Sequence, residues 1–137
     1  MNKDCVFCKI IAGEIPSDKV YEDEFVLSFL DLHPVMPGHT LIMPKQHSDG
    51  FLSTDDEILR QLVPEMKKIA KAVMQVTSAH GVNISTNHGA AAGQSVFHLH
   101  FHIIPRFDKD GLKPWPHQES EPKSRKEIAE AIKKQLS

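Results

Sequence analysis

Three histidines alternate with apolar residues in the stretch SVFHLHFHIIPRF, residues 95–107. They are His98, His100 and His102. Because the side chains of a β-strand point alternately to its two faces, this spacing places the imidazoles on one face and the apolar side chains in the core. Neighbouring imidazoles would lie about 7 Å apart and the outer pair about 13 Å apart, so one metal ion could not easily bind all three. We interpret the row as a reactive face open to a cleft; the alternative is a polar strand surface that is rich in histidine.

Imidazoles in such a row can do nucleophilic chemistry. A neutral imidazole nitrogen attacks phosphorus when a neighbour fixes its tautomer and a third group supplies protons or charge. The segment directly before the histidines, NHGAAAGQS at residues 87–95, consists mainly of small residues that let backbone N–H groups approach an anion. Gln94 and Ser95 add polar side chains there. A plain loop is the alternative for this segment alone, but its position beside the histidines favours a phosphate-binding loop.

Two cysteines, Cys5 and Cys8, form a Cys-x-x-Cys pair near the start of the chain. Such a pair supplies half of a tetrahedral zinc site. A thioredoxin-like redox role is disfavoured because no predicted strand precedes the pair, and a disulfide is disfavoured in a reducing compartment. From the residues alone, zinc ligation and two partly buried thiols that pack in the core are equal alternatives.

The elements that must position these residues follow from hydrophobic periodicity and turn residues. Strands are predicted at residues 19–23, 25–32, 38–44, 81–87 and 95–105. Helices are predicted from residues 53–54 to a cap at Gly81, with a kink or split at Pro64, and over residues 123–136. Two separate helices among adjacent short strands predict an α+β fold, with an antiparallel sheet of about five strands and two main helices.

The composition excludes several classes of protein. The chain has 137 residues, 40% of them hydrophobic and 25% charged, which predicts one domain over residues 1–137. A net charge of −2 gives no electrostatic footprint for nucleic acid or for an anionic membrane. The N-terminus lacks the pattern of a signal peptide, and no apolar run reaches the ~18 residues of a membrane span. We therefore expect a cytoplasmic protein with no nucleic-acid partner and no membrane partner.

The motif HLHFHII resembles the His-x-His-x-His-x-x signature of the histidine triad (HIT) family of nucleotide-binding proteins. The match extends through AGQSVFHLHFHIIPR, and FLDLHPVMPGHTLIMPKQH looks like the second segment that the family shares. The similarity covers the chain from Cys5 to about Arg106 and leaves residues 107–137 as a variable tail and helix. The resemblance implies a HIT-like fold, a homodimer, and hydrolysis or transfer of nucleoside monophosphates.

The resemblance also implies roles for individual residues. His100 would attack the α-phosphorus and carry a nucleotidyl intermediate. His102 and His39 would contact the phosphate oxygens, and Ser95 would bond to the leaving group. The residues that would bind the nucleotide are Asp31 at the ribose, Asn87, Gln94 and Gly93 in the phosphate loop, and Phe7, Ile10, Phe29 and Leu32 around a purine base. Without the resemblance, these four apolar residues would be assigned to the core, Asp31 to a turn and His39 to the surface.

A zinc site is implied by the same resemblance. The opening CVFCKI, together with a histidine after a Pro-Lys pair, is similar to a bacterial-type branch of the family that binds zinc. The implied Zn²⁺ ligands are Cys5, Cys8, His47 and His98. They would form a closed structural site with no open position for catalysis. No organic cofactor is expected. The three histidines of the row would then divide their work: His98 holds zinc, His100 is the nucleophile and His102 binds phosphate.

Three functions compete. The first is an enzyme that acts on the α-phosphate of purine nucleoside phosphoramidates or dinucleoside polyphosphates (AMP or GMP derivatives) through a covalent nucleotidyl-histidine intermediate. The second is a nucleotide-binding regulatory module with little turnover. The third is a metalloprotein that uses several of the nine histidines for a catalytic metal. The complete histidine row favours the enzyme, because a pure binding module needs no nucleophile.

Overall fold

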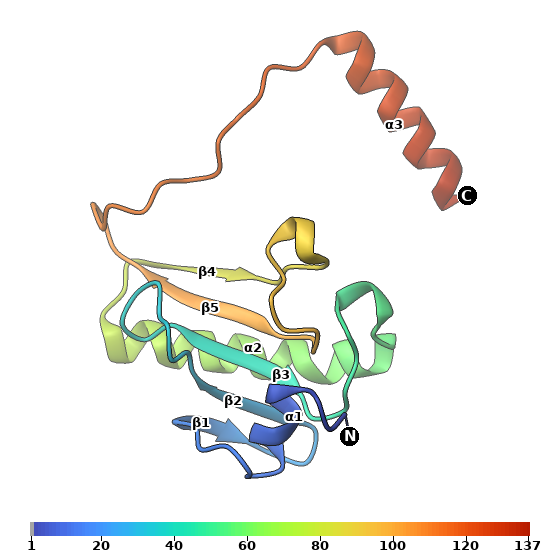
Figure 1. Ribbon diagram of the computed structural model, residues 1–137. Helices are drawn as coiled ribbons and strands as arrows, with labels where there is room; N and C mark the ends of the chain where they lie inside the picture. Colours follow the sequence, from blue (N-terminus) through green and yellow to red (C-terminus); the bar gives the residue numbers. More distant parts are fainter. Residues whose placement is uncertain (1) are drawn as a thin grey trace.

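A five-stranded antiparallel sheet forms the centre of the fold (Figure 1). The computed structural model describes residues 2–137. The strand order is β1-β2-β3-β5-β4, and every neighbouring pair is antiparallel. The strands are β1 (Lys19–Glu22), β2 (Val26–Leu30), β3 (Thr40–Pro44), β4 (Gly81–Ser85) and β5 (Phe101–Arg106). The predicted α+β class, with its five strands, is confirmed.

Helices cover both faces of this sheet. The long helix α2 (Asp56–Thr77) packs on one face and the short helix α1 (Val6–Ile11) on the other (Figure 1). The third helix, α3 (Pro122–Leu136), follows an extended segment near the end of the chain. The two predicted helices correspond to α2 and α3. Helix α1 was not predicted, because six residues are too few to show a helical period.

Strands β2 and β3 are buried on both faces, which explains why their sequences are continuous apolar runs. The buried residues on the α2 side are Val26, Ile42, Leu62, Met66, Ile69, Ala70, Leu99 and Ile103. Those on the α1 side are Cys5, Phe7, Cys8, Ile10, Leu27, Phe29, Leu41 and Met43. The predicted inward orientation of the apolar residues between the histidines is therefore confirmed for Leu99 and Ile103, and Phe101 is partly buried against the same cluster. The second cluster fixes the N-terminal segment to the sheet.

Helix α2 differs from its prediction at three points. It begins after Asp55, because residues 51–53 form a separate 3₁₀ turn. It is not split at Pro64, which lies on the exposed side of the helix, where water can bond to the carbonyl that lacks its usual partner. It ends at Ser78, whose left-handed backbone (φ 57°) caps the helix, so the predicted cap Gly81 instead begins β4.

The fifth strand is shorter than predicted. It begins at Phe101, so His98 and His100 lie in an irregular segment before it and only His102 belongs to the ladder. The reason lies in competing hydrogen bonds: the Leu99 N–H donates to the Ser48 carbonyl, and the His98 ring bonds to the carbonyl of Pro44. Residues 98–99 are therefore hydrogen-bonded to the end of β3 and the loop after it, and they do not pair as part of the sheet. The prediction that all three imidazoles extend from one regular strand is wrong. His98 is fully buried, whereas His100 and His102 line a cavity.

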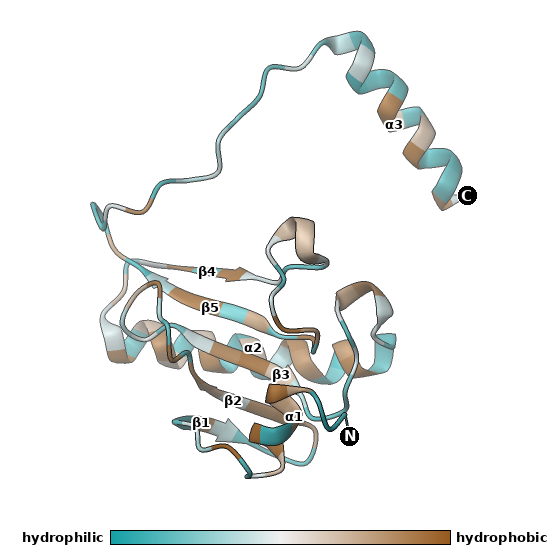
Figure 2. Ribbon diagram, in the orientation of Figure 1, coloured by the Kyte–Doolittle hydropathy of each residue, from teal (hydrophilic) through white to brown (hydrophobic). Residues whose placement is uncertain are grey.

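Residues 107–137 form an arm. An extended segment leaves the end of β5 and carries α3 well away from the sheet (Figure 1). Every residue of α3 is exposed, and the ribbon of this helix alternates between teal and brown segments in Figure 2, which mark its hydrophilic and hydrophobic residues. Among residues 2–137, no helix is long and apolar enough to cross a membrane.

Candidate functional site

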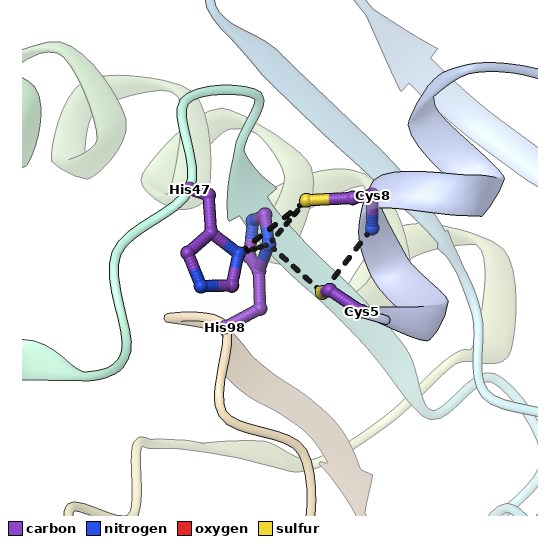
Figure 3. Close-up of side chains that lie close together, drawn as sticks. All are labelled: Cys5, Cys8, His47 and His98. Carbon is purple, nitrogen blue, oxygen red and sulfur yellow. Dashed lines mark hydrogen bonds between the residues drawn. The ribbon is translucent and has the colours of Figure 1, made fainter. Parts of the chain in front are cut away.

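Four donor atoms from three separate segments meet beside α1 (Figure 3). Cys5 and Cys8 come from the start of α1, His47 follows β3, and His98 precedes β5. The Nδ1 atom of His98 lies 3.5 Å from the Cys5 Sγ and 3.6 Å from the Cys8 Sγ. The Nδ1 atom of His47 lies 3.4 Å from the Cys8 Sγ and 3.2 Å from the His98 Nδ1. The structure therefore brings together all four residues of the predicted metal site.

These distances fit a tetrahedral zinc ion. Zn–S bonds of about 2.3 Å and Zn–N bonds of about 2.05 Å at tetrahedral angles place sulfur and nitrogen about 3.6 Å apart and two nitrogens about 3.3 Å apart. The outer nitrogen of each imidazole also has a partner. The His98 Nε2–H donates to the Pro44 carbonyl at 2.8 Å, and the His47 Nε2 lies 3.2 Å from an Asp49 carboxylate oxygen. Such partners direct the Nδ1 lone pair toward a metal.

Burial shifts the pKa of two of the four donors, His98 and Cys5. Burial lowers the pKa of His98 to about 4, so its imidazole is neutral and able to ligate at neutral pH. Burial raises the pKa of the Cys5 thiol, and a bound cation would reverse that effect by stabilising the thiolate. The four side chains can thus hold one Zn²⁺ with no coordination position left for a substrate.

His100 has a single available tautomer. Its Nδ1 lies 2.7 Å from the backbone carbonyl of His98, and because a carbonyl only accepts, Nδ1 carries the proton. The Nε2 atom therefore keeps a free lone pair. Burial lowers the pKa of this imidazole, which keeps it neutral, and the Phe7 ring packs edge-on against it with ring centres 5.0 Å apart. A neutral imidazole with an unprotonated Nε2 is the form that can act as a nucleophile.

His39 and His102 form a second chain of defined tautomers. The backbone N–H of Val35 donates to the His39 Nδ1 at 3.0 Å, so His39 carries its proton on Nε2. That Nε2–H donates to the His102 Nδ1 at 2.9 Å, which leaves the proton of His102 on its own Nε2. Burial, followed by the neighbouring imidazoles, lowers the pKa of His102 to about 4, and burial lowers that of His39. His102 is therefore a neutral donor beside the lone pair of His100.

A cavity of about 320 Å³ opens at these imidazoles. Eight of the predicted site residues line it: Phe7, Ile10, Phe29, Asp31, Leu32, Ser95, His100 and His102. Three of the apolar residues in this wall are also buried in the core, so the two interpretations of them are compatible; Leu32 is instead 70% exposed at the rim. Asp31 reaches the imidazole chain, with its Oδ2 3.5 Å from the His39 Nε2. The cavity thus combines an apolar wall, a carboxylate and two neutral imidazoles.

Three predicted phosphate-loop residues do not line this cavity: Asn87, Gly93 and Gln94. The Gln94 side chain is buried and bonds to the backbone, donating to the carbonyls of Asp49 and Val96 and accepting from the Gly89 N–H. Both of its N–H donors are occupied, so it shapes the loop. Gly93 has a φ of 93°, which suits glycine at this turn.

Several groups in the site were not predicted. His33 and Val96 line the cavity, and the sequence offers no pattern that distinguishes them from other loop residues. The most informative groups are backbone atoms, namely the carbonyls of Pro44 and His98 and the N–H of Val35. Every residue carries such groups, so residue types and spacing give no signal for them.

The sheet, its histidine cluster and the adjoining Cys₂His₂ donor set define an α+β protein with a histidine-based site. A family model described as HIT domain matches residues 12–109, and the chain belongs to this family. The predicted resemblance is thus confirmed, with the HIT-like fold.

Curated relatives and solved structures agree with this assignment. An uncharacterized HIT-like protein of Borreliella burgdorferi is 52% identical over 111 residues, 80% of each chain. The adenylylsulfatase HINT3 of Arabidopsis thaliana is 43% identical over 82% of this chain and 57% of its own length. A crystal structure from Streptococcus mutans is 43% identical, covers 100% of this chain and 88% of that chain, and has a TM-score of 0.94. A Zn-bound histidine triad family protein of Mycobacterium smegmatis is 38% identical over 88% of both chains, with a TM-score of 0.76.

Proposed function

We propose that this protein is a nucleotide hydrolase or transferase that acts on the α-phosphate of purine nucleoside phosphoramidates or dinucleoside polyphosphates. One observation carries the proposal: the His98 carbonyl holds the Nδ1 proton of His100, so that an unprotonated Nε2 is available at a cavity with a carboxylate and an apolar wall. Burial of the imidazole, which keeps it neutral, supports the same role. The similarity to an adenylylsulfatase agrees with chemistry at the phosphate of an adenylyl group.

The nucleoside would occupy the 320 Å³ cavity. Its base would lie against the apolar wall formed by Phe7, Ile10, Phe29 and Leu32, and its ribose hydroxyls would donate to Asp31. The Nε2–H of His102 would donate to a phosphate oxygen and stabilise the charge that develops there. His39 would act indirectly, because its Nε2–H donates to the His102 Nδ1 and so keeps the proton of His102 on Nε2. Gln94, Gly93 and Asn87 would shape the loop that carries Ser95.

Turnover would proceed in two displacements. The Nε2 of His100 forms a bond to the α-phosphorus while the bond from phosphorus to the leaving nitrogen or oxygen breaks. The leaving group takes up a proton, which the Ser95 hydroxyl can pass to it. Water then attacks the same phosphorus and loses a proton, which restores the one that the leaving group took through Ser95. The phosphorus–Nε2 bond breaks, and the nucleoside monophosphate leaves with His100 neutral again.

We also propose that Zn²⁺ is held by Cys5, Cys8, His47 and His98 as a structural ion. When bound, it would supply a cross-link between the N-terminal segment, the segment after β3 and the segment before β5, and no organic cofactor is needed. The proposal follows from the donor distances and from the similarity to a Zn-bound relative. The cross-link fixes residue 98, whose carbonyl orients the nucleophile.

We further infer one domain over residues 1–137, a cytoplasmic location with neither nucleic acid nor membrane as partner, and a homodimer. Support for the homodimer comes from β4, the edge strand of the sheet, whose outer backbone groups have no partner strand within residues 2–137. An edge of this kind pairs readily with a second copy.

The test is hydrolysis of adenosine 5′-phosphoramidate by the wild type and by His100→Ala. His80→Ala is the matched control, because His80 is exposed, lies outside residues 87–95 and does not line the cavity. We expect turnover in the wild type and control, and loss of nearly all turnover with retained AMP binding in His100→Ala. Turnover in His100→Ala would remove this residue from the nucleophile role. AMP binding without turnover of the phosphoramidate or of a dinucleoside polyphosphate by the wild type would favour a regulatory binding module.

A further inference from the structure

The cavity proposed to hold the nucleoside continues into a second cavity. That second cavity has a volume of about 320 Å³ and is lined by three segments of the chain, which include Asp4, Asp49 and Phe97. Three residues line both cavities: Val6, Ser95 and Val96. The two cavities therefore meet beside Ser95. We call the first the nucleotide cavity and the second the outer cavity.

The walls of the outer cavity are held in place by buried groups. The side-chain amide of Gln94 is buried and donates to the carbonyls of Asp49 at 2.6 Å and Val96 at 3.1 Å, which belong to two different walls. Cys5 lies in the third wall, and its Sγ is 3.5 Å from the His98 Nδ1 (Figure 3). A cavity whose walls are fixed in this way loses little conformational entropy when a ligand binds.

The junction at Ser95 gives the substrate a direction. In the proposed reaction the bond from phosphorus to the leaving group breaks beside this serine, while the nucleoside fills the nucleotide cavity. The leaving group must then extend out of the nucleotide cavity, and the outer cavity begins at Ser95. A larger cavity of about 560 Å³ contains the cationic side chains of Arg106 and Lys113, but in the part of the chain that the structure describes it shares no lining residue with the nucleotide cavity.

The charged side chains of the outer cavity are carboxylates. Asp4 and Asp49 line it, and no lysine or arginine from residues 2–137 does so. Asp49 lies 3.2 Å from the outer nitrogen of His47, and no lysine or arginine in these residues forms an ion pair with either carboxylate. A concave site with charges of one sign attracts a ligand of the opposite sign and repels a ligand of the same sign. The outer cavity therefore suits a cation and disfavours a phosphate chain.

Apolar side chains complete the outer cavity. Phe97 and Val6 line it and are 49% and 40% exposed. Methylene groups pack well on such side chains, and the face of an aromatic ring also attracts a cation. A primary alkylamine carries its positive charge at neutral pH, as lysine does. An alkyl chain that ends in an ammonium group thus matches both the apolar and the charged parts of this cavity.

We propose that the outer cavity receives the leaving group, and that Asp4 and Asp49 select an amine whose alkyl chain ends in an ammonium group over a phosphate chain. This inference rests on the enzymatic function proposed above, and it favours phosphoramidates over dinucleoside polyphosphates. As the His100 Nε2 bonds to phosphorus, the phosphorus–nitrogen bond breaks, and the nitrogen takes one proton through the Ser95 hydroxyl and leaves as a free amine. The ammonium group at the far end keeps its proton throughout and bonds to the carboxylates.

The leaving-group preference can be measured with three adenosine 5′-phosphoramidates of similar length. Their amines are 1,5-diaminopentane, hexylamine and 6-aminohexanoate, which end in a cationic, a neutral and an anionic group. We expect kcat/KM to be about tenfold higher for the diamine than for hexylamine, because each exposed carboxylate contributes modestly, and to be lowest for the anionic amine. Equal values for the three, or the highest value for the anionic amine, would overturn the proposal.

Variants of the two carboxylates test their part in this preference. Asp4→Asn and Asp49→Asn should each lower the ratio of kcat/KM for the diamine to that for hexylamine about threefold, and the double variant should bring the ratio close to one. Asp18→Asn is the matched control, because it makes the same change at an exposed carboxylate outside both cavities. The ratio compares two substrates on one variant, so a general loss of folded protein cancels. An unchanged ratio in the double variant, or an equal fall in Asp18→Asn, would refute the role of these carboxylates.

A third measurement does not depend on turnover. The protein is saturated with AMP and titrated with 1,5-diaminopentane or hexylamine while its backbone amides are followed by NMR. We expect the diamine to shift the amides of residues 2–6, 49 and 95–97, and hexylamine to shift them much less. No shifts at these residues, or equal shifts with both amines, would contradict the cation site. Such shifts without hydrolysis of any phosphoramidate would reject the proposed enzyme and support the cation site, whereas hydrolysis of adenosine 5′-phosphoramidate with no preference among the longer amines would reject this inference alone.

Discussion

The zinc dependence of thermal stability is the most direct check on the four-donor site. An ion that binds only the folded chain raises the free energy of unfolding by about 1.4 kcal/mol for each tenfold rise in free ion above the dissociation constant. Residues 2–137 contain one cluster of two cysteines and two histidines that could hold such an ion. For 137 residues, unfolding carries about 0.29 kcal/mol/K of entropy near Tm. The expected rise in Tm is therefore about 5 °C per tenfold increase in free zinc.

The assay is differential scanning fluorimetry at constant pH in metal-ion buffers that set free zinc over several decades. His47→Ala removes the most exposed imidazole of the set, and His80→Ala removes an exposed imidazole outside the cluster. We expect the slope of Tm against log free zinc to be lost in His47→Ala and kept in His80→Ala. A wild-type Tm that is independent of zinc, or an unchanged slope in His47→Ala, would refute the structural zinc site. A slope of about 10 °C would require two ions.

Three further predictions concern catalysis and packing. Burial lowers the pKa of His100, and it lowers that of His102 to about 4, so both rings stay neutral as the pH falls below 6.5. The acid limb of kcat/KM for adenosine phosphoramidate should therefore lie below pH 6.5. An acid limb at or above pH 6.5 would contradict the neutral state of these rings. Asp31→Asn should raise KM for the ribonucleotide substrate about tenfold, since an acceptor for the ribose hydroxyls is weakened. KM for the 2′-deoxy substrate should change little. Equal effects on the two substrates would show that Asp31 does not bind the ribose hydroxyls. Gly38→Ala should lower the free energy of unfolding in urea by about 1–3 kcal/mol, because φ is +96° and an added Cβ would lie 2.7 Å from the Thr77 Cγ2. Gly13→Ala, with a similar φ but open space around it, should cost less; an equal cost would exclude the contact with Thr77 as the cause.

Much of the fold was predictable because it depends on periodicity. The continuous apolar runs of β2 and β3 follow from burial on both faces, and the long apolar stripe of α2 follows from packing on the sheet. The convergence of Cys5, Cys8, His47 and His98 was predictable only through the family resemblance. Their sequence separations give no geometric information by themselves.

The parts that sequence reasoning missed depend on single hydrogen bonds. The segment before β5 leaves the sheet because Leu99 and His98 bond to the loop after β3. Gln94 has the expected polarity, but its amide is used by backbone groups of its own loop and of Asp49. Helix α1 is stabilised by packing and by a cysteine at its N-cap, where sequence rules expect serine, threonine, asparagine or aspartate. Local propensity was overridden by tertiary contacts in each case.

Residue 98 serves two sites through two different parts of the same residue. Its side chain supplies a donor atom to the Cys₂His₂ cluster, and its main-chain carbonyl fixes the proton of His100. The identity of the amino acid matters for the first task and only its position for the second. A change of the side chain at this point would remove one of the bonds that fix the segment, but the backbone bond from the Leu99 N–H to the Ser48 carbonyl would still hold the carbonyl of residue 98 near the nucleophile. Retention of the cysteine pair and retention of the central histidine are separable traits in the history of such a chain.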